Sequence, residues 1–286
     1  MLRSIIYWRG VKRDILSKFV NENQHFILRM IRNGGSFFGV IPPVTKNLII
    51  INALIWLAMM VLPNRLGIDF VRYGGLHYIT APDFNVVQVI SYMFMHSTQG
   101  IAHLFFNMFT LFMFGITLER VLGGKRFLFY YISCGIGAAI IQELTWAMMM
   151  NSYITENVEM VVANFAHANG MSMEQAKSYI SPVELMHLKQ NIENALVTVG
   201  ASGAIYGVLL AFGMLFPNRP LYLMFIPVPI KAKWMVLGYG LIELSLGLSS
   251  ASDGIAHFAH LGGMIFGFFI ILHWKRKGIV GGNGYY

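Results

Sequence analysis

Six apolar segments that are almost free of charged residues limit what this chain can fold into. A helix needs about 20 mostly apolar residues to cross the hydrocarbon core of a bilayer. The fourth and fifth segments are short and are expected to extend into their flanks. The segments are residues 47–62, 101–118, 127–150, 202–216, 234–248 and 257–274. Only 12 % of the 286 residues are charged, against about 25 % in soluble proteins. The sequence therefore predicts an all-α membrane protein with six transmembrane helices.

The positive charges fall mainly on one side of these six segments. If the N-terminus is inside, the inner segments hold 17 of the 21 Lys and Arg residues. Eight of them precede the first helix, and three follow each of the second, fourth and sixth helices. The four outside are Arg65, Arg72, Lys177 and Lys189. Cytoplasmic loops carry such an excess of positive charge, so both termini are predicted to be cytoplasmic. The net charge of +8 therefore gives no reason to expect a nucleic-acid partner.

The two ends of the chain are predicted to lie in the cytoplasm. Residues 1–46 form a basic N-terminal segment, in which we expect no cleavable signal peptide. Residues 16–32 have an amphipathic pattern that fits either a helix on an anionic membrane surface or a small cytoplasmic domain. Residues 276–286 are expected to form a short tail. The single cysteine, Cys134, excludes an intrachain disulfide.

Two long segments lie on the predicted external side. Residues 63–100 mix aromatic and apolar residues with turn formers, and part of this loop is expected to lie in the membrane interface. Residues 151–199 are predicted to form a helical insertion, because two stretches match the capping box of a helix N-terminus. These stretches are Ser172 to Gln175 and Ser181 to Glu184.

Several polar residues share one depth in the predicted bundle. Ser202 begins the fourth helix, His260 lies about one turn into the sixth, and His103 and Asn107 lie in the first two turns of the second. All three helices run from outside to inside, so these side chains lie in one layer just below the external surface. Polar groups in membrane helices are costly and are candidates for function. The alternatives are a contact of small residues around Ser202 and interhelical hydrogen bonds from His103 and Asn107.

This layer has the residue types that acyl transfer requires. A serine nucleophile needs a base within hydrogen-bond reach, which His260 would supply. It also needs donors where negative charge develops on the attacked carbonyl oxygen, which His103 and Asn107 would supply. The carboxylate nearest to His260 along the chain is Asp253, seven residues earlier and roughly 10 Å away if the stretch is helical. The sequence therefore predicts a Ser–His dyad without a third carboxylate.

Other polar residues in the predicted helices are weaker candidates for a functional role. His257 and His260 have the spacing of a metal-binding pair, but the sequence offers no obvious third ligand unless His103 or His96 serves. We therefore expect no metal and no other cofactor. Glu143 and Glu243 lie inside predicted helices, where each is either a proton-relay group, as in a transporter, or a structural hydrogen-bonding group.

The chain resembles the rhomboid family of intramembrane serine proteases over residues 47–275. Three motifs occur in the order found in that family. They are H-x-x-x-N (His103, Asn107), G-x-S-G (Gly200, Ser202, Gly203) and A-H-x-x-G-x-x-x-G (Ala259, His260, Gly263, Gly267). The resemblance implies a six-helix protease domain, with Ser202 as nucleophile, His260 as general base and then acid, and Tyr206 packed on that histidine. It also implies an oxyanion hole from the Ser202 amide, His103 and Asn107.

The resemblance further implies that the substrates are transmembrane proteins, cut in or near their membrane helices. Six helices without a seventh suggest a multi-pass protein of the bacterial plasma membrane; the oligomeric state is left open. The segment 151–199 either affects substrate access or is a tolerated surface insertion. Two other functions are weighed: a catalytically inactive relative that binds membrane proteins, and a transporter that uses Glu143, Glu243 and the histidines.

Overall fold

The computed structural model describes residues 39, 41–223, 226–249 and 256–280. The basic stretch 1–38, with its amphipathic pattern at 16–32, lies outside the described residues, as do Asp253 and residues 281–286.

Helices lie over all six segments that were predicted to cross the membrane. Four are long and apolar enough to cross a bilayer, and α11 is a shorter apolar helix. The six-span topology and its orientation stay predictions. The helices are α3 (Pro43–Leu66), α6 (Ala102–Thr110) with η2 (Leu111–Gly115) and α7 (Ile116–Leu122), α8 (Gly124–Asn169), α11 (Ser202–Leu215), α12 (Ala232–Leu248) and α13 (His257–Arg276).

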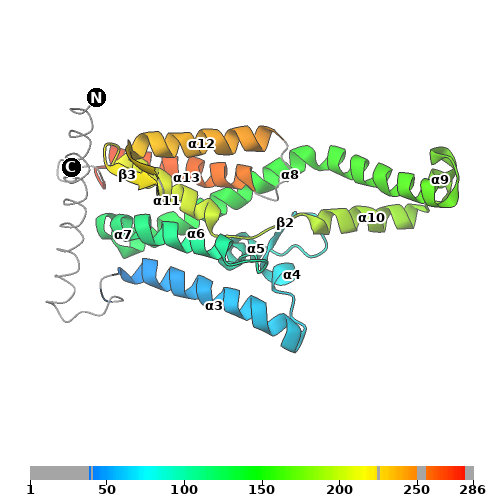
Figure 1. Ribbon diagram of the computed structural model, residues 1–286, viewed down its shortest axis with the longest axis horizontal. Coiled ribbons are helices and arrows are strands. Elements are labelled where there is room, and N and C mark those ends of the chain that lie inside the picture. Colours follow the sequence, from blue (N-terminus) through cyan, green and yellow to red (C-terminus); the bar gives the residue numbers. More distant parts are fainter. Residues whose placement is uncertain (1–38, 40, 224–225, 250–255, 281–286) are drawn as a thin grey trace, which may run out of the picture.

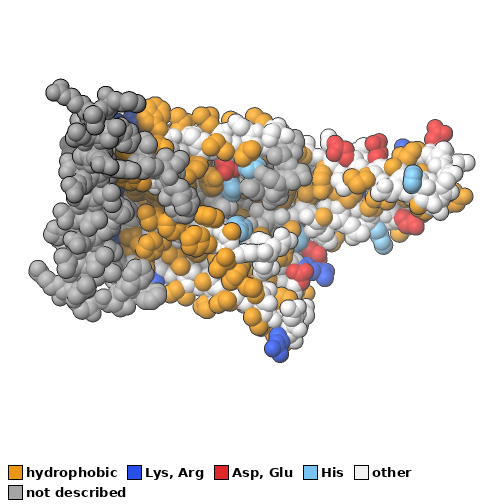
Figure 2. All heavy atoms as spheres, viewed as in Figure 1, with side chains coloured by type: hydrophobic (Ala, Val, Ile, Leu, Met, Phe, Trp, Pro, Cys, Tyr) orange, Lys and Arg blue, Asp and Glu red, His pale blue; other side chains and the backbone are white. Residues whose placement is uncertain are grey.

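The helices lie roughly side by side in a bundle, with α11 and α13 packed against α8 (Figure 1). Figure 2 shows hydrophobic side chains over the visible face of this bundle, as contact with lipid requires. Short elements connect the helices. They are α4 (Phe70–Gly74), β1 (Leu76–His77), α5 (Gln88–Ser91), η1 (Tyr92–Phe94), β2 (Val197–Thr198) and the antiparallel pair β3 (Pro220–Leu223) and β4 (Ile226–Lys231).

One helix runs through the predicted boundary between the third membrane helix and the external insertion. Helix α8 continues without a break to Asn169, because residues 151–169 contain neither Gly nor Pro. It ends where Gly170 adopts a left-handed conformation with φ of 64°. Residues 151–169 therefore extend a bundle helix beyond the other helices (Figure 1).

Two further helices complete this extension. They are α9 (Met173–Tyr179) and α10 (Pro182–Ala195), and both predicted capping boxes are confirmed at their first residues. Helix α10 returns beside α8 toward the bundle (Figure 1). We call residues 151–195 the arm. Its visible surface carries several acidic side chains, unlike the apolar face of the bundle (Figure 2).

The chain that leads into α11 is held by the loop that follows α3. Strand β2 pairs antiparallel with β1, with Leu76 opposite Thr198. Two residues later the Gly200 amide donates a hydrogen bond of 2.9 Å to the Tyr92 carbonyl. The Tyr92 hydroxyl in turn donates to the Gly135 carbonyl of α8 at 2.7 Å. The start of α11 is thus fixed against both the external loop and the long helix.

Candidate active site

The structure brings Ser202 and His260 together at the same end of two neighbouring helices. Ser202 is the first residue of α11, and His260 lies in the first turn of α13. The Oγ atom of Ser202 lies 2.8 Å from Nε2 of His260, a hydrogen-bonding distance. The first amides of a helix have no partner within that helix. The Ser202 amide and the positive end of the α11 dipole therefore face the region next to Oγ.

Glycines set the close approach that makes this contact. A Cβ atom on Gly263 would collide with the carbonyl group of Gly203, so α11 and α13 meet backbone to backbone there. A Cβ atom on Gly203 would lie 2.5 Å from Cβ of Ala138, and one on Gly267 would collide with the Tyr130 hydroxyl. The glycines around Ser202 therefore serve both helix packing and the site, because this packing brings the serine to the histidine.

The ring of His260 is covered by the ring of Tyr206. The two rings are stacked, with centroids 4.3 Å apart and planes 9° from parallel. Tyr206 lies one turn after Ser202 on α11, so one helix supplies both the serine and a surface for the imidazole. The face of the ring and its Nε2 atom are each held by α11.

His103 lies near the serine from another helix. Its Nδ1 atom accepts a hydrogen bond from the Ser97 amide at 3.3 Å, which leaves the proton of the neutral ring on Nε2. A Cβ atom on Gly200 would lie 3.0 Å from Nε2 of His103 and 3.6 Å from Oγ of Ser202. Gly200 also has a φ of 135°, a conformation that favours glycine. Because position 200 carries no side chain, the space between Oγ and Nε2 stays open.

Asn107 is buried, and its amide nitrogen donates to the His103 carbonyl at 2.8 Å. An amide nitrogen carries two hydrogens, so this bond uses one of its two donors. Behind His103 lies His96, which is fully buried, with ring centroids 5.1 Å apart. Burial, reinforced by His103, lowers the pKa of His96 to about 4. This second ring is therefore a neutral group at neutral pH.

A carboxylate contacts His260, and this pairing was not predicted from the sequence. Oε2 of Glu243, on α12, lies 2.9 Å from Nδ1 of His260 and 2.6 Å from Nδ1 of His257. The Tyr206 hydroxyl donates to the other oxygen, Oε1. The prediction of no third carboxylate considered only residues close to His260 in the sequence, whereas Glu243 reaches the histidine from a different helix. Its position in an otherwise apolar helix was the available signal.

The expectation that the His257–His260 pair lacks a third metal ligand is therefore wrong. Ligand atoms of Glu243, His257 and His260 lie within 4.8 Å of one another, and two imidazoles with a carboxylate form a ligand set that zinc accepts. Atoms bound to tetrahedral zinc at about 2.0 Å lie roughly 3.3 Å apart. The 2.6 Å between Nδ1 of His257 and Oε2 of Glu243 is a hydrogen-bond distance, shorter than this spacing of zinc ligands.

Glu143 is not part of this cluster. Its Oε2 atom accepts a hydrogen bond from the Ile79 amide at 3.0 Å. This contact is a structural hydrogen bond, one of the two roles that the sequence left open for Glu143. Glu143 joins α8 to the external loop.

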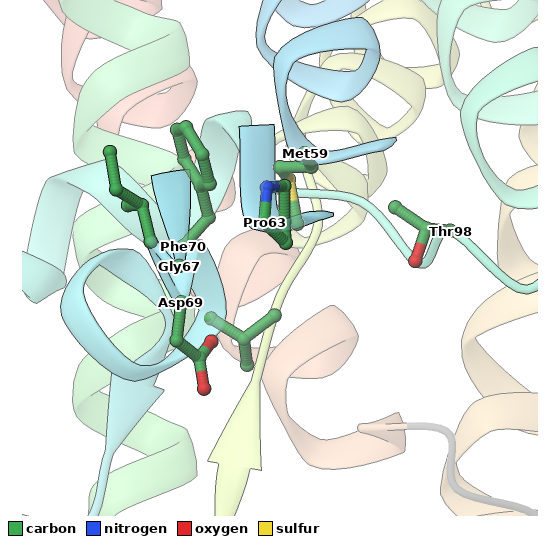
Figure 3. Close-up of a pocket in the computed structure, with 8 residues that line it drawn as sticks. Met59, Pro63, Gly67, Asp69, Phe70 and Thr98 are labelled. Atoms are coloured by element: carbon green, nitrogen blue, oxygen red, sulfur yellow. The ribbon is translucent and has the colours of Figure 1, made fainter. Parts of the chain in front are cut away.

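A separate pocket of about 340 Å³ lies where α3 ends and α4 begins. Met59, Pro63, Phe70 and Thr98 line it, and Figure 3 shows Asp69 beside them. Oδ1 of Asp69 accepts from an amide of α4 as its N-cap. The pocket lining contains none of the residues predicted for the site. Its one acidic side chain, Asp69, caps a helix. The pocket therefore belongs to the packing of the external loop.

Comparison with known families agrees with the motifs. A family model described as the rhomboid domain matches residues 83–276, a region that contains Ser202, His260, His103 and Asn107. No curated protein matches the chain at a significant level. Rhomboid proteases are integral membrane hydrolases that act on transmembrane substrates within the bilayer. Since the matched region covers more than half of the chain, this protein belongs to the rhomboid family.

Proposed function

We propose that this protein is an intramembrane serine endopeptidase in which Ser202 is the nucleophile and His260 the general base and acid. It would hydrolyse peptide bonds in or near the membrane helices of other proteins. The observation that carries the proposal is the 2.8 Å contact between Oγ of Ser202 and Nε2 of His260. A base at this distance takes up the serine proton as Oγ attacks.

The chemistry proceeds in two halves. Oγ of Ser202 attacks the carbonyl carbon of the peptide, and its proton passes to Nε2 of His260. The tetrahedral intermediate collapses, the C–N bond breaks, and His260 returns the proton to the leaving amine. A water molecule then attacks the acyl-enzyme with His260 as base, which releases the new carboxyl group and restores the serine.

The developing oxyanion would lie in the open space beside Gly200. There the Ser202 amide, the Nε2–H group of His103 and the Asn107 side chain are the candidate donors. A Cβ atom on Gly200 would lie 3.0 Å from Nε2 of His103 and 3.6 Å from Oγ of Ser202, so Nε2 lies close to the nucleophile, where an oxyanion donor is needed. A side chain at position 200 would fill this space.

The substrate must present an extended peptide to this site. Carbonyl groups inside an intact helix accept hydrogen bonds from their own helix, so a substrate helix must unwind locally before Ser202 can attack. The resemblance implies a cut after a small residue near helix-breaking residues.

The test is cleavage of a model transmembrane substrate in proteoliposomes, together with labelling by a fluorophosphonate, which phosphonylates an activated serine. Wild type is expected to cleave and to be labelled. Ser202→Ala and His260→Ala are expected to lose roughly 10⁴-fold or more in cleavage rate, while both proteins stay folded. The control is Glu143→Gln, whose side chain can still accept from Ile79 and which should retain activity.

Three outcomes would contradict the proposal. Cleavage that persists in Ser202→Ala excludes this nucleophile. A folded wild type that neither cleaves nor labels indicates an inactive relative that binds membrane proteins. Substrate-dependent flux into liposomes that is unaffected by Ser202→Ala indicates a transporter.

A further inference from the structure

We propose that Glu243 is a positioning residue that orients the ring of His260 toward Ser202, with His257 as the anchor of the carboxylate. This inference rests on the proposed function, because it assigns a role toward the histidine base of that reaction. The site would then use a carboxylate from α12, a histidine from α13 and a serine from α11.

The two ring nitrogens of His260 face two different groups. Nε2 faces Oγ of Ser202 at 2.8 Å, and Nδ1 faces Oε2 of Glu243 at 2.9 Å. A carboxylate at Nδ1 favours the tautomer with its proton on that atom, which leaves the lone pair of Nε2 free to accept the serine proton. A base that is oriented by a third group in this way is the usual arrangement around a serine nucleophile.

The carboxylate is itself held from two sides. The Tyr206 hydroxyl donates to Oε1, and Nδ1 of His257 lies 2.6 Å from Oε2. Glu243 is only 6 % exposed, and an isolated charge in such a place would be very costly. Its surroundings supply donors, so Glu243 can stay in contact with His260 as an anion.

The contact with His260 becomes most favourable during the reaction. Among the described residues, Nδ1 of His260 has no aligned hydrogen-bond acceptor, so in the resting site the 2.9 Å contact is an electrostatic one. When Nε2 takes up the serine proton, the ring becomes a cation next to a buried anion. That attraction is strong where water is excluded, and it lowers the barrier because it is greater in the transition state than in the resting enzyme.

Tyr206 links the two functions of this cluster. Its ring stacks on His260 while its hydroxyl donates to Glu243. One side chain therefore restrains both the imidazole and the carboxylate, which keeps their relative geometry fixed. A shift of α12 relative to α11 would disturb this connection, so the position of α12 is tied to the reactivity of Ser202.

The experiment compares wild type, Glu243→Gln and Glu243→Asp in proteoliposomes that contain a chelator. Glu143→Gln is the matched control, since it makes the same chemical change in a different membrane helix. Each protein is assayed for kcat, KM, rate of fluorophosphonate labelling and thermal unfolding. Labelling reports the reactivity of Ser202 without a peptide substrate.

We expect Glu243→Gln to lower kcat and the labelling rate by about 10²- to 10⁴-fold, with KM nearly unchanged, because Glu243 touches His260 and not the substrate. Glu243→Asp should recover part of the loss by restoring a carboxylate. The Glu143→Gln control should behave as wild type. A purely structural role would instead lower the unfolding temperature together with activity and would not be rescued by aspartate.

A second pair of variants keeps the test decisive if Glu243→Gln does not fold. Tyr206→Phe keeps the ring but removes its hydroxyl donor to Glu243. This substitution should slow labelling several-fold in the wild-type background. It should have a smaller effect in the Glu243→Asp background, because the shorter side chain withdraws the carboxylate from that hydroxyl. The effects of mutations at two interacting residues do not add. Equal effects in both backgrounds would overturn the inference.

The remaining outcomes separate this inference from the proposed function. Wild-type activity that is unchanged in Glu243→Gln overturns the role of Glu243 alone. Loss of wild-type activity in chelator, restored by Zn²⁺, would make the cluster of Glu243, His257 and His260 a metal site and would also overturn it. A wild type that neither cleaves nor labels overturns both.

Discussion

The tautomers and contacts of individual side chains in this protein depend on partners in other elements. His103 receives a hydrogen bond from the Ser97 amide, which fixes its proton on Nε2, and it lies against the buried ring of His96. Motif spacing could place His103 and Asn107 on one helix face, but it carried no information on the tautomer. That information depends on the loop before α6, which folds back onto the histidine.

His96 gives the protein a stability that depends on pH. Its folded pKa of about 4 lies below the value of about 6.5 for an exposed histidine. The unfolded chain therefore binds a proton first as the pH falls. The stabilisation is fully present above pH ~6.5 and is lost between ~6.5 and ~4, by about 3 kcal/mol at most.

Replacement of His96 by Gln should flatten this part of the pH dependence. The measurement is the free energy of unfolding in detergent at several values between pH 7 and pH 4. His187→Gln, at an exposed position on α10, is the control and should retain the wild-type slope. A slope that is the same in His96→Gln and in wild type would contradict the assignment.

At the scale of elements, the contact between α11 and α13 depends on the absence of side chains. Gly263→Ala would place a methyl group on the Gly203 carbonyl, and a backbone group cannot rotate away. We expect a loss of about 1–3 kcal/mol in unfolding free energy. A larger fractional loss of activity should accompany it, because Ser202 and His260 would move apart.

Gly238→Ala is the matched control for that substitution. Gly238 lies inside α12, and a Cβ atom there would meet no other atom within 4 Å. Alanine at this position should raise the stability by about 0.5–1 kcal/mol. Unfolding measured for both variants in the same detergent would show the difference. Equal effects at the two positions would mean that the Gly203–Gly263 contact does not determine the packing.

At the scale of the whole molecule, the base of the arm and the adjoining part of α8 contact the loop between α3 and α6. Tyr78 packs edge-on against Trp146, and the Asp83 amide donates to the Asn194 side chain at the end of α10. The last residues of the arm then lead through β2 into α11. The arm is therefore joined by a short connection to the helix that begins with Ser202.

Shortening the arm tests whether it selects substrates. Removal of residues 158–189, replaced by a flexible linker, keeps the contacts of Trp146 and Asn194 with the loop. We expect fluorophosphonate labelling of Ser202 to persist while the relative rates for several transmembrane substrates change. Unchanged relative rates would identify the arm as a tolerated surface insertion. Loss of labelling would show that the arm supports the fold of the site itself.

Local features of the sequence were enough to define the elements and the family. The length of each apolar segment, the capping boxes before α9 and α10 and the order of three motifs are all read along the chain. The absence of Gly and Pro before Gly170 also marks the end of α8, which lies beyond the predicted end of the membrane span at residue 150. These features are local because hydrogen bonding within a helix involves residues four apart.

Only the tertiary structure decided which polar groups meet. Glu243 and His260 lie on different helices, and their contact depends on the separation and rotation of α12 and α13. The same holds for the open space beside Gly200, which is bounded by His103 from another helix. Sequence by itself determined the positions of the main helices and the candidates for chemistry. Packing decided their partners, because side chains from separate helices meet only when the glycine contacts set how closely those helices approach.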